Sequence, residues 1–407
     1  MRTFAKSDKL HGVCYDVRGP VLDAANEMKR QGTEILQLNI GNPAPFGFQA
    51  PSWILDAIRD ALDDPMSQGY SESNGIVEAR EAILDYHRSK GLPNLEMNHI
   101  YIGNGVSEMI SLAMQGLLND GDEILIPAPD YPLWTAAAKL AGGTPVHYIC
   151  DEKSNWYPDI ADMEKKINSR TKGIVIINPN NPTGAVYPKE ILEQIAQIAR
   201  EKELIIFSDE IYDRLVLDGY QHTSIASLAP DVFCVTFSGL SKSHMIAGFR
   251  IGWMVLSGDL SKAKGYIEGV NMLSSMRLCA NVPAQHVIAP ALRNRPEVDD
   301  LLLPGGRIYE QRKVICDAIA EIDGLSAVTP EAAFYIFPKI DAKRFHILDD
   351  EKFALDFLRE KHVLLVHGRG FNWEAPDHFR IVYLPEVAVL DECMTKMKEF
   401  LADYQQK

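Results

Sequence analysis

Residues 173–215 read GIVIINPNNPTGAVYPKEILEQIAQIAREKELIIFSDEIYDRL and contain two short apolar runs on either side of a helical pattern. In the helical pattern, Ile191, Ile195 and Ile198 recur on one stripe. Pro188 stands near its start, where the missing N–H costs little. A strand, a helix and a second strand in this order are typical of a crossover between parallel strands. The stretch therefore predicts one unit of an α/β fold.

The same alternation extends on both sides of this unit. Further apolar runs, which we expect to be strands, are HIYIGNG (99–105), EILIPAP (123–129), FCVTFSGL (233–240) and IGWMVL (251–256). Strands that alternate with helical patterns predict a mostly parallel sheet. From about residue 295 the pattern changes to a charged helix around 306–322 and an amphipathic final helix, which predicts a second, smaller α+β domain.

The composition excludes several classes of protein. A chain of 407 residues that is 46% hydrophobic can bury more than one core. Its formal net charge of -15 disfavours nucleic acid as a partner. The six cysteines stand singly, which indicates reduced thiols rather than a disulfide framework or a metal site. Because the sequence has no signal-peptide pattern and no run long enough for a membrane span, we expect a cytoplasmic protein with no membrane partner.

A lysine loop is the first candidate for chemistry. In TFSGLSKSHMIAGFRIGW (236–253), small and hydroxyl side chains surround Lys242, and Arg250 follows eight residues later. An amine that attacks an aldehyde must lose its proton, which partial burial or a nearby positive charge favours. Taken alone, however, the stretch fits a solvent-exposed loop lysine better.

Two strand ends carry further candidates. In IINPNNPTG (176–184) the Asn181 amide could donate to a ligand oxygen, although Asn-Pro pairs also make rigid turns without any catalysis. In LIIFSDEIY (204–212) Asp209 could pair with a protonated ring nitrogen, and Tyr212 could reach a neighbouring phenolic oxygen. A strand-end carboxylate can equally cap the next element.

A glycine turn before a helix gives a candidate phosphate site. In HIYIGNGVSEM (99–109) the free N–H groups at the helix start attract an anion. The dinucleotide pattern GxGxxG fails because its sixth position is Glu108. The turn therefore predicts a site for a single phosphate group.

Together, the order and spacing of these motifs resemble the class I pyridoxal-phosphate aminotransferases over essentially the whole chain. The matching segments are NPNNPTG, DEIY and SKSHMIAGFR. The resemblance implies a fold type I architecture, in which a large domain with a mostly parallel seven-stranded sheet is joined to a smaller α+β domain. The implied divisions are an amino-terminal segment that joins the small domain and the partner subunit (1–48), a large cofactor-binding domain (49–295) and a small domain (296–407).

The resemblance also implies pyridoxal 5'-phosphate as cofactor. Lys242 would hold its aldehyde, Asp209 would keep its pyridine nitrogen protonated, and Asn181 and Tyr212 would hydrogen-bond its phenolic oxygen. Around the phosphate, the implied residues are Gly105, Val106, Ser107, Ser241 and Arg250. The family loop has a serine three residues before the lysine, where this chain has Gly239, and both Ser238 and Ser241 are nearby. Which serine reaches the phosphate stays open.

Further implied residues bind the ring, the substrate and a second subunit. Tyr131 would stack on the ring, and Tyr70 would reach the phosphate of the partner subunit in a homodimer. Arg380 would grip the substrate α-carboxylate with its planar fork, and Gly41 would add a backbone contact. The freed Lys242 amine would then carry a proton between the substrate α-carbon and the cofactor.

Substrate choice depends on a closer resemblance within the family. CYDVRGPV, LNIGNPAPFGF, APDYPLWTAA, KGYIEG and MRLCANVPAQH are similar to the bacterial glutamate-pyruvate (alanine) aminotransferases. This implies transfer between L-alanine and 2-oxoglutarate, giving pyruvate and L-glutamate. Arg18 and Arg277 are candidates for the second carboxylate, with an ion pair as the alternative for each, and Tyr15 would line the pocket. The rival functions are an aspartate, aromatic or branched-chain aminotransferase, a lyase of the same fold, and a noncatalytic binding protein.

Overall fold

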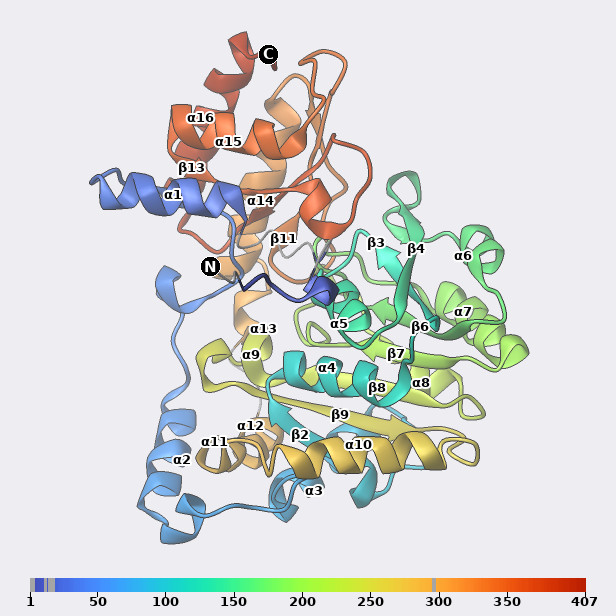
Figure 1. Cartoon of the computed structure of the whole chain (residues 1–407). Helices are drawn as coiled ribbons and strands as arrows, with labels where there is room; N and C mark the ends of the chain where they lie inside the picture. The colour runs from blue at the N-terminus through green and yellow to red at the C-terminus, as the bar shows by residue number, and fades with distance from the viewer. Residues whose placement is uncertain (1–3, 11–12, 14–18, 295–297) are drawn as a thin grey trace.

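The computed structural model of the chain describes residues 4–10, 13, 19–294 and 298–407. Figure 1 shows a large twisted sheet with helices on both faces, and above it a smaller unit of helices and short strands that contains the carboxyl terminus. Within the described ranges, no helix is long and apolar enough to cross a membrane.

The large sheet has eight strands in the part of the chain that is described. In spatial order they are β2 (Ile100–Asn104), β9 (Ile251–Ser257), β8 (Cys234–Gly239), β7 (Ile205–Asp209), β6 (Thr171–Ile177), β3 (Glu123–Ala128), β4 (Thr144–Asp151) and β5 (Tyr157–Pro158). Neighbours from β8 to β4 are parallel, whereas β9 and β5 run against their neighbours. The mostly parallel sheet is thus confirmed. It has one strand more than the seven that the resemblance implies, if the two-residue β5, antiparallel to the end of β4, is counted.

The central strands are covered on both faces, which explains their continuous apolar runs. Every residue of β3 and β8 is buried. At the carboxyl ends of neighbouring strands, Ile177 pairs with Asp209, which in turn pairs with Phe237. The polar residues that follow these strands therefore meet along one edge of the sheet.

Helices cover both faces and the antiparallel edge of this sheet. On one face are α4 (Val106–Leu117), α5 (Leu133–Leu140) and α10 (Lys264–Met276). On the other are α6 (Ile160–Lys166), α7 (Lys189–Lys202) and α8 (Ile225–Leu228). Against β2 and β9 pack α2 (Ser52–Asp63), α3 (Val77–Ser89), α11 (Val282–Gln285) and α12 (Ile288–Arg293). The predicted crossover helix is α7, which buries Ile195 and Ile198 against the sheet.

The smaller unit is built around three helices. They are α14 (Arg307–Glu321), α15 (Asp350–Lys361) and α16 (Val387–Asp403), of which the first and last are the two helices expected from the sequence. Its strands form a sheet of β11 (Tyr335–Ile336), β15 (Phe379–Val382) and β14 (Val366–His367), and a pair of β10 (Leu325–Ser326) and β12 (Lys339–Ile340).

The amino-terminal segment lies against the smaller unit. Helix α1 (Pro20–Arg30) packs on α15, and β1 (Leu36–Gln37) pairs in parallel with β13 (Val363–Leu364). Val21, Ala25 and Leu38 share one apolar core with residues of α14, α15 and α16. The segment then runs past the carboxyl edge of the large sheet on its way to α2.

Candidate active site

A cavity of about 530 Å³ lies at this carboxyl edge, where the large sheet, the smaller unit and the amino-terminal segment meet. The lining residues that the sequence predicted are Gly41, Val106, Ser107, Tyr131, Asn181, Asp209, Tyr212, Ser241, Lys242, Arg250 and Arg380. The lining residues that it did not predict are Ile40, Asn42, Ala44, Ile177, Ile211, Ala247, Gly248 and Tyr335. The structure thus brings into one cavity residues that are up to 340 positions apart in the sequence, from Ile40 to Arg380.

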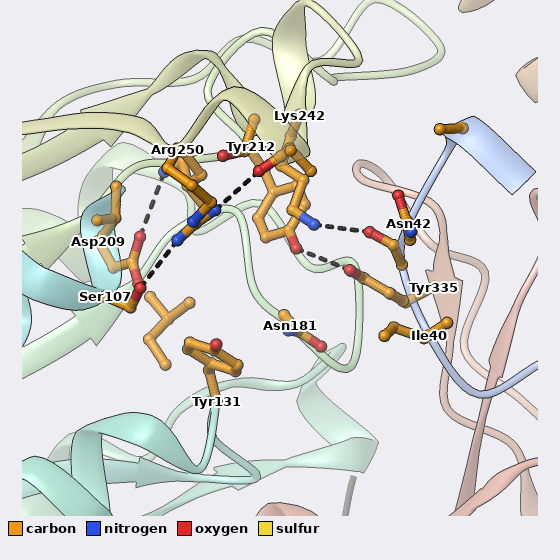
Figure 2. Close-up of a pocket in the computed structure, with 18 of the residues that line it drawn as sticks. Ile40, Asn42, Ser107, Tyr131, Asn181, Asp209, Tyr212, Lys242, Arg250 and Tyr335 are labelled. Carbon is orange, nitrogen blue, oxygen red and sulfur yellow. Dashed lines mark hydrogen bonds between the residues drawn. The ribbon is translucent and has the colours of Figure 1, made fainter. Parts of the chain in front are cut away.

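The Lys242 amine points into this cavity (Figure 2). The residue lies in α9 (Leu240–Ser243), a single turn that follows β8 directly. Its Nζ donates a hydrogen bond of 2.7 Å to the backbone oxygen of Gly41 and lies 5.6 Å from the centre of the Phe334 ring. The side chain is half-buried rather than solvated. The description of Lys242 as an exposed loop lysine is therefore wrong.

Asp209 is a buried carboxylate at the end of β7. Its Oδ2 accepts a hydrogen bond of 3.1 Å from the indole Nε1 of Trp134, and its Oδ1 accepts one of 3.3 Å from the backbone of Ile211. Burial raises the pKa of Asp209 to about 6, although both hydrogen bonds act in the opposite direction. No cation of the described residues forms an ion pair with this carboxylate. A positively charged ligand atom would relieve the cost of burying it.

Tyr212, three residues further on, presents its hydroxyl to the same cavity. This hydroxyl lies 2.8 Å from the hydroxyl of Tyr335, which comes from β11 of the smaller unit. Burial, followed by the neighbouring Tyr335, raises the pKa of Tyr212 well above its ordinary value. Tyr212 therefore keeps its proton at neutral pH, and either of the two hydroxyls can be the donor of this hydrogen bond.

An anion-binding cradle is formed at the start of α4. Gly105, with φ +87°, directly precedes the helix, and Val106 and Ser107 of the first turn line the cavity. The start of a helix favours an anion because its first N–H groups have no partner within the helix. The guanidinium of Arg250 donates to the Ser107 hydroxyl over 3.1 Å and to the Ala247 backbone oxygen over 2.9 Å. A Cβ at Gly105 would collide with this guanidinium. The cradle therefore combines a cation, a hydroxyl and a helix start.

Arg380 provides another cation in the lining of the cavity. It lies in β15 and donates to Asn181 Oδ1 over 3.0 Å and to the backbone oxygen of Asn39. Its guanidinium also covers the rings of Tyr335 and Phe371, at 4.6 and 4.7 Å from their centres. These contacts fix the plane of the fork, which suits a carboxylate.

A buried cluster of charges lies behind the Asp209–Tyr212 turn. The Lys90 amine, just after α3, pairs with Glu210 at 2.6 Å and with Asp213 at 2.9 Å. Ser224 also donates to Glu210, over 2.6 Å. Asp209, Ile211 and Tyr212 thus line the cavity, whereas Glu210 and Asp213 belong to this cluster, which anchors the turn from behind.

Several predicted residues lie elsewhere. Tyr70 is outside the cavity lining and is 82% exposed. Arg277 is tied to the large domain, since it donates to the backbone oxygens of Ser73 and Ile102 and lies 3.4 Å from a Glu108 carboxylate oxygen. Tyr15 and Arg18 lie outside the described residues. Of the two serines near the lysine, Ser241 lines the cavity, whereas Ser238 is buried within β8.

The class of protein follows from comparison with known families. Residues 33–395 match the family of class I and II aminotransferases, and the chain belongs to that family. Members of this family use pyridoxal phosphate.

Individual relatives are similar over the full length. Glutamate-pyruvate aminotransferase AlaA of Haemophilus influenzae is 58% identical over 407 residues, which are 100% of both chains. Alanine aminotransferase of Mycobacterium tuberculosis is 50% identical over 406 residues, which are 100% of this chain and 94% of that protein. A crystal structure of an aminotransferase from Escherichia coli, 56% identical, superimposes with a TM-score of 0.98 and covers 100% of both chains.

Proposed function

We propose that this chain transfers the amino group between L-alanine and 2-oxoglutarate, giving pyruvate and L-glutamate. The observation that carries the proposal is the convergence of Lys242, Asp209 and Arg380 on one cavity in a chain 58% identical, over its full length, to a protein named glutamate-pyruvate aminotransferase. The relative named alanine aminotransferase, 50% identical, supports the same substrates.

Three features of the cavity fit pyridoxal phosphate. A half-buried amine, that of Lys242, suits the aldehyde. The buried Asp209 carboxylate, with no cation beside it among the described residues, suits a protonated pyridine nitrogen. The cradle at Gly105, Ser107 and Arg250 suits a phosphate. When bound, the cofactor supplies an electron sink for the bond that breaks at the substrate α-carbon.

The chain's own residues would then divide the work as follows. Lys242 would hold the aldehyde carbon, and its amine, when free, would move the proton between the substrate α-carbon and the cofactor C4′. Asp209 keeps the ring nitrogen protonated, while Asn181 and Tyr212 donate to the phenolic oxygen. Tyr131 packs on the ring, and Val106 and Ser241 add to the phosphate cradle. These residues would hold the phosphate end of the cofactor in place.

Arg380 and Gly41 would bind the substrate α-carboxylate. The fork of Arg380 is held in plane by Asn181 and the Asn39 backbone, so little ordering is needed when the carboxylate arrives. Because Arg277 is already bound to backbone oxygens, Arg18 is the candidate that we propose for the second carboxylate of 2-oxoglutarate, and Tyr15 stays a candidate for the pocket lining; both lie outside the described residues.

The proposal includes a cytoplasmic homodimer, with divisions at residues 1–48, 49–295 and 296–407. Exposed apolar side chains lie on α2, just before Tyr70, and in the last part of α10 or just after it, namely Leu62, Met66, Met272, Met276 and Leu278. The end of α10 lies beside the Tyr70 segment, since Arg277 donates to the Ser73 backbone. A second copy would bury these side chains and bring Tyr70 to its partner's phosphate. A monomer in sedimentation at micromolar concentration would contradict this part.

The test is a panel of amino donors incubated with pyruvate or 2-oxoglutarate and pyridoxal phosphate. We expect L-alanine and L-glutamate to be the best donors, with exchange lost in Lys242→Ala and retained in Lys153→Ala, which changes an exposed lysine that does not line the cavity. Preference for aspartate, aromatic or branched-chain donors would support the alternative aminotransferases. Release of ammonia without exchange would indicate the lyase and overturn the proposal.

A further inference from the structure

Tyr335 connects the two halves of the cavity. It comes from β11 in the smaller unit, is buried, and lies within hydrogen-bonding distance of Tyr212 from the large sheet (Figure 2). Strand β11 pairs with β15, so Tyr335 and Arg380 belong to the same small sheet. Any shift of that sheet relative to the large one moves both side chains together against Tyr212.

Each part of the Tyr335 side chain has a contact of its own. The Arg380 guanidinium lies 4.6 Å from the ring centre. The hydroxyl lies 2.8 Å from that of Tyr212 and directly under the backbone of Gly41, where a Cβ would collide with it. The oxygen of Gly41 in turn accepts the hydrogen bond from Lys242. The ring of Tyr335 therefore supports Arg380, the arginine proposed to bind the substrate, whereas its hydroxyl contacts Tyr212 and Gly41 in the cavity lining.

The direction of the hydrogen bond between the two tyrosines depends on what occupies the cavity. A phenol has one proton to donate. If Tyr212 donates to an oxygen of a bound ligand, it can only accept from Tyr335, and Tyr335 becomes the donor of the pair. A cation over the ring face of Tyr335 draws electron density from it and makes its hydroxyl a better donor. A chain of two donors polarises the last one more strongly than a single hydroxyl does.

We propose that Tyr335 is a positioning residue with two separable roles. Its hydroxyl donates to Tyr212 and thereby strengthens the hydrogen bond that Tyr212 donates to the cofactor's phenolic oxygen. Its ring holds the Arg380 fork at the angle that receives the substrate carboxylate. This inference rests on the proposed function and adds a residue that no sequence motif marks.

The experiment separates the two roles with Tyr335→Phe and Tyr335→Leu. Tyr335→Phe keeps the ring and removes the hydroxyl, and Tyr335→Leu removes both. The matched control is Tyr383→Phe, another buried tyrosine of the smaller unit, whose hydroxyl donates to the Ala333 backbone over 3.2 Å and does not line the cavity. The readouts are pyridoxal phosphate titration of the apoprotein by tryptophan fluorescence, the pH midpoint of the bound cofactor's absorbance change, and kcat and KM for L-alanine.

For Tyr335→Phe we expect cofactor affinity and kcat to fall about three- to ten-fold, as for the loss of one hydrogen bond, with KM unchanged. The pH midpoint should rise, because a weaker donor on the phenolic oxygen leaves the neighbouring nitrogen more basic. Tyr335→Leu should also raise KM about ten-fold or more, because the Arg380 fork loses its support. Tyr383→Phe should match the wild type in all readouts.

A double-mutant cycle with Tyr212→Phe gives the sharpest test. If Tyr335 acts through Tyr212, the hydroxyl deletion at 335 changes neither the pH midpoint nor the cofactor affinity in the Tyr212→Phe background. An undiminished effect in that background, or a Tyr335→Phe protein equal to the wild type, overturns the inference alone. A wild type that binds no pyridoxal phosphate overturns the proposed function together with it.

Discussion

The indole Nε1 of Trp134 donates a hydrogen bond of 3.1 Å to Asp209 Oδ2. Among the described residues, that carboxylate accepts only one other hydrogen bond, from the backbone of Ile211. Trp134 and Asp209 are fully or almost fully buried. The apoprotein thus keeps a carboxylate in a place where burial raises its pKa to about 6. A buried carboxylate without a cation lowers the stability of the apoprotein, and a cationic ligand atom would remove this cost. At Asp209 the chain therefore has lower stability for the sake of function.

Asp209→Asn should therefore stabilise the apoprotein while abolishing transamination. A raised pKa means that the folded chain binds more protons than the unfolded chain between about pH 4 and 6, so wild-type stability falls as the pH rises through this range. Above pH 6 the wild type bears the full free-energy cost of the buried charged carboxylate, on the order of 3 kcal/mol, and the variant does not. Urea unfolding of both apoproteins at pH 5 and pH 8 measures it. If the stability advantage of Asp209→Asn over the wild type does not grow from pH 5 to pH 8, the expectation is contradicted.

The turn that carries Asp209 and Tyr212 should depend on Lys90 behind it. Lys90→Met leaves Glu210 and Asp213 buried without their cation, at a cost of about 3 to 5 kcal/mol in the free energy of unfolding. Lys90 holds the pKa of both carboxyls below the ordinary range, so the wild type loses this stabilisation only as the pH falls through their folded values.

In the Lys90→Met variant, protonation of Glu210 and Asp213 removes their unpaired charges. The loss in free energy of unfolding relative to the wild type should therefore be smaller at pH 4.5 than at pH 7. Urea unfolding at both pH values gives the measurement. The control is Lys262→Met, which breaks an exposed pair with Glu203 and should leave the urea midpoint unchanged. Equal losses in both variants would show that the cluster does not anchor the turn.

Gly105 and Gly121 form a matched pair for testing the phosphate cradle. Both have positive φ, +87° and +92°, so alanine strains the backbone at each. Only at Gly105 would the new Cβ meet the Arg250 guanidinium, since nothing lies within 4 Å at Gly121. We expect Gly105→Ala to weaken pyridoxal phosphate binding about ten-fold or more, as for one lost charged hydrogen bond, and Gly121→Ala to leave it unchanged. Titration of the two apoproteins with pyridoxal phosphate measures both affinities. Equal affinities would show that Arg250 does not bind the phosphate.

The sequence predicts this site where the relevant residues are close together in the chain. Asp209 and Tyr212 follow one strand, and Lys242 and Arg250 follow the next. Since parallel strands end at the same edge, a correct strand prediction already brings these groups together. The family resemblance then extended the prediction to Arg380 and Gly41, which no strand pattern connects to the others.

Residues that act through distant partners were missed. Trp134 and Asp209 are 75 positions apart, and Tyr212 and Tyr335 are 123 apart. In the sequence, Trp134 and Tyr335 look like ordinary apolar positions of a helix and a strand, and only packing shows that their polar ends meet the site. For Arg277, the ion pair that the sequence left open as an alternative is present with Glu108, and the guanidinium also donates to backbone oxygens.

Arg380 should be essential for substrate binding in a way that lysine cannot replace. Its hydrogen bonds to Asn181 and to the Asn39 backbone use separate nitrogens of the fork, and stacking on Tyr335 and Phe371 fixes the plane. An ammonium group has neither the fork nor the stacking face. For Arg380→Lys we therefore expect KM for both L-alanine and 2-oxoglutarate to rise about 10- to 100-fold, with the affinity for pyridoxal phosphate nearly unchanged.

Arg369→Lys is the control for this substitution. Arg369 comes from η8 (Gly368–Phe371), pairs with Asp349 and Asp350, and does not line the cavity. Steady-state kinetics with each substrate, together with cofactor titration, should leave this variant like the wild type. A fall in kcat with unchanged KM in Arg380→Lys, or an equal loss in both variants, would mean that Arg380 supports the fold rather than the carboxylate. A rise in KM for one substrate only would also contradict the assignment, because both substrates present the same α-carboxylate to this arginine.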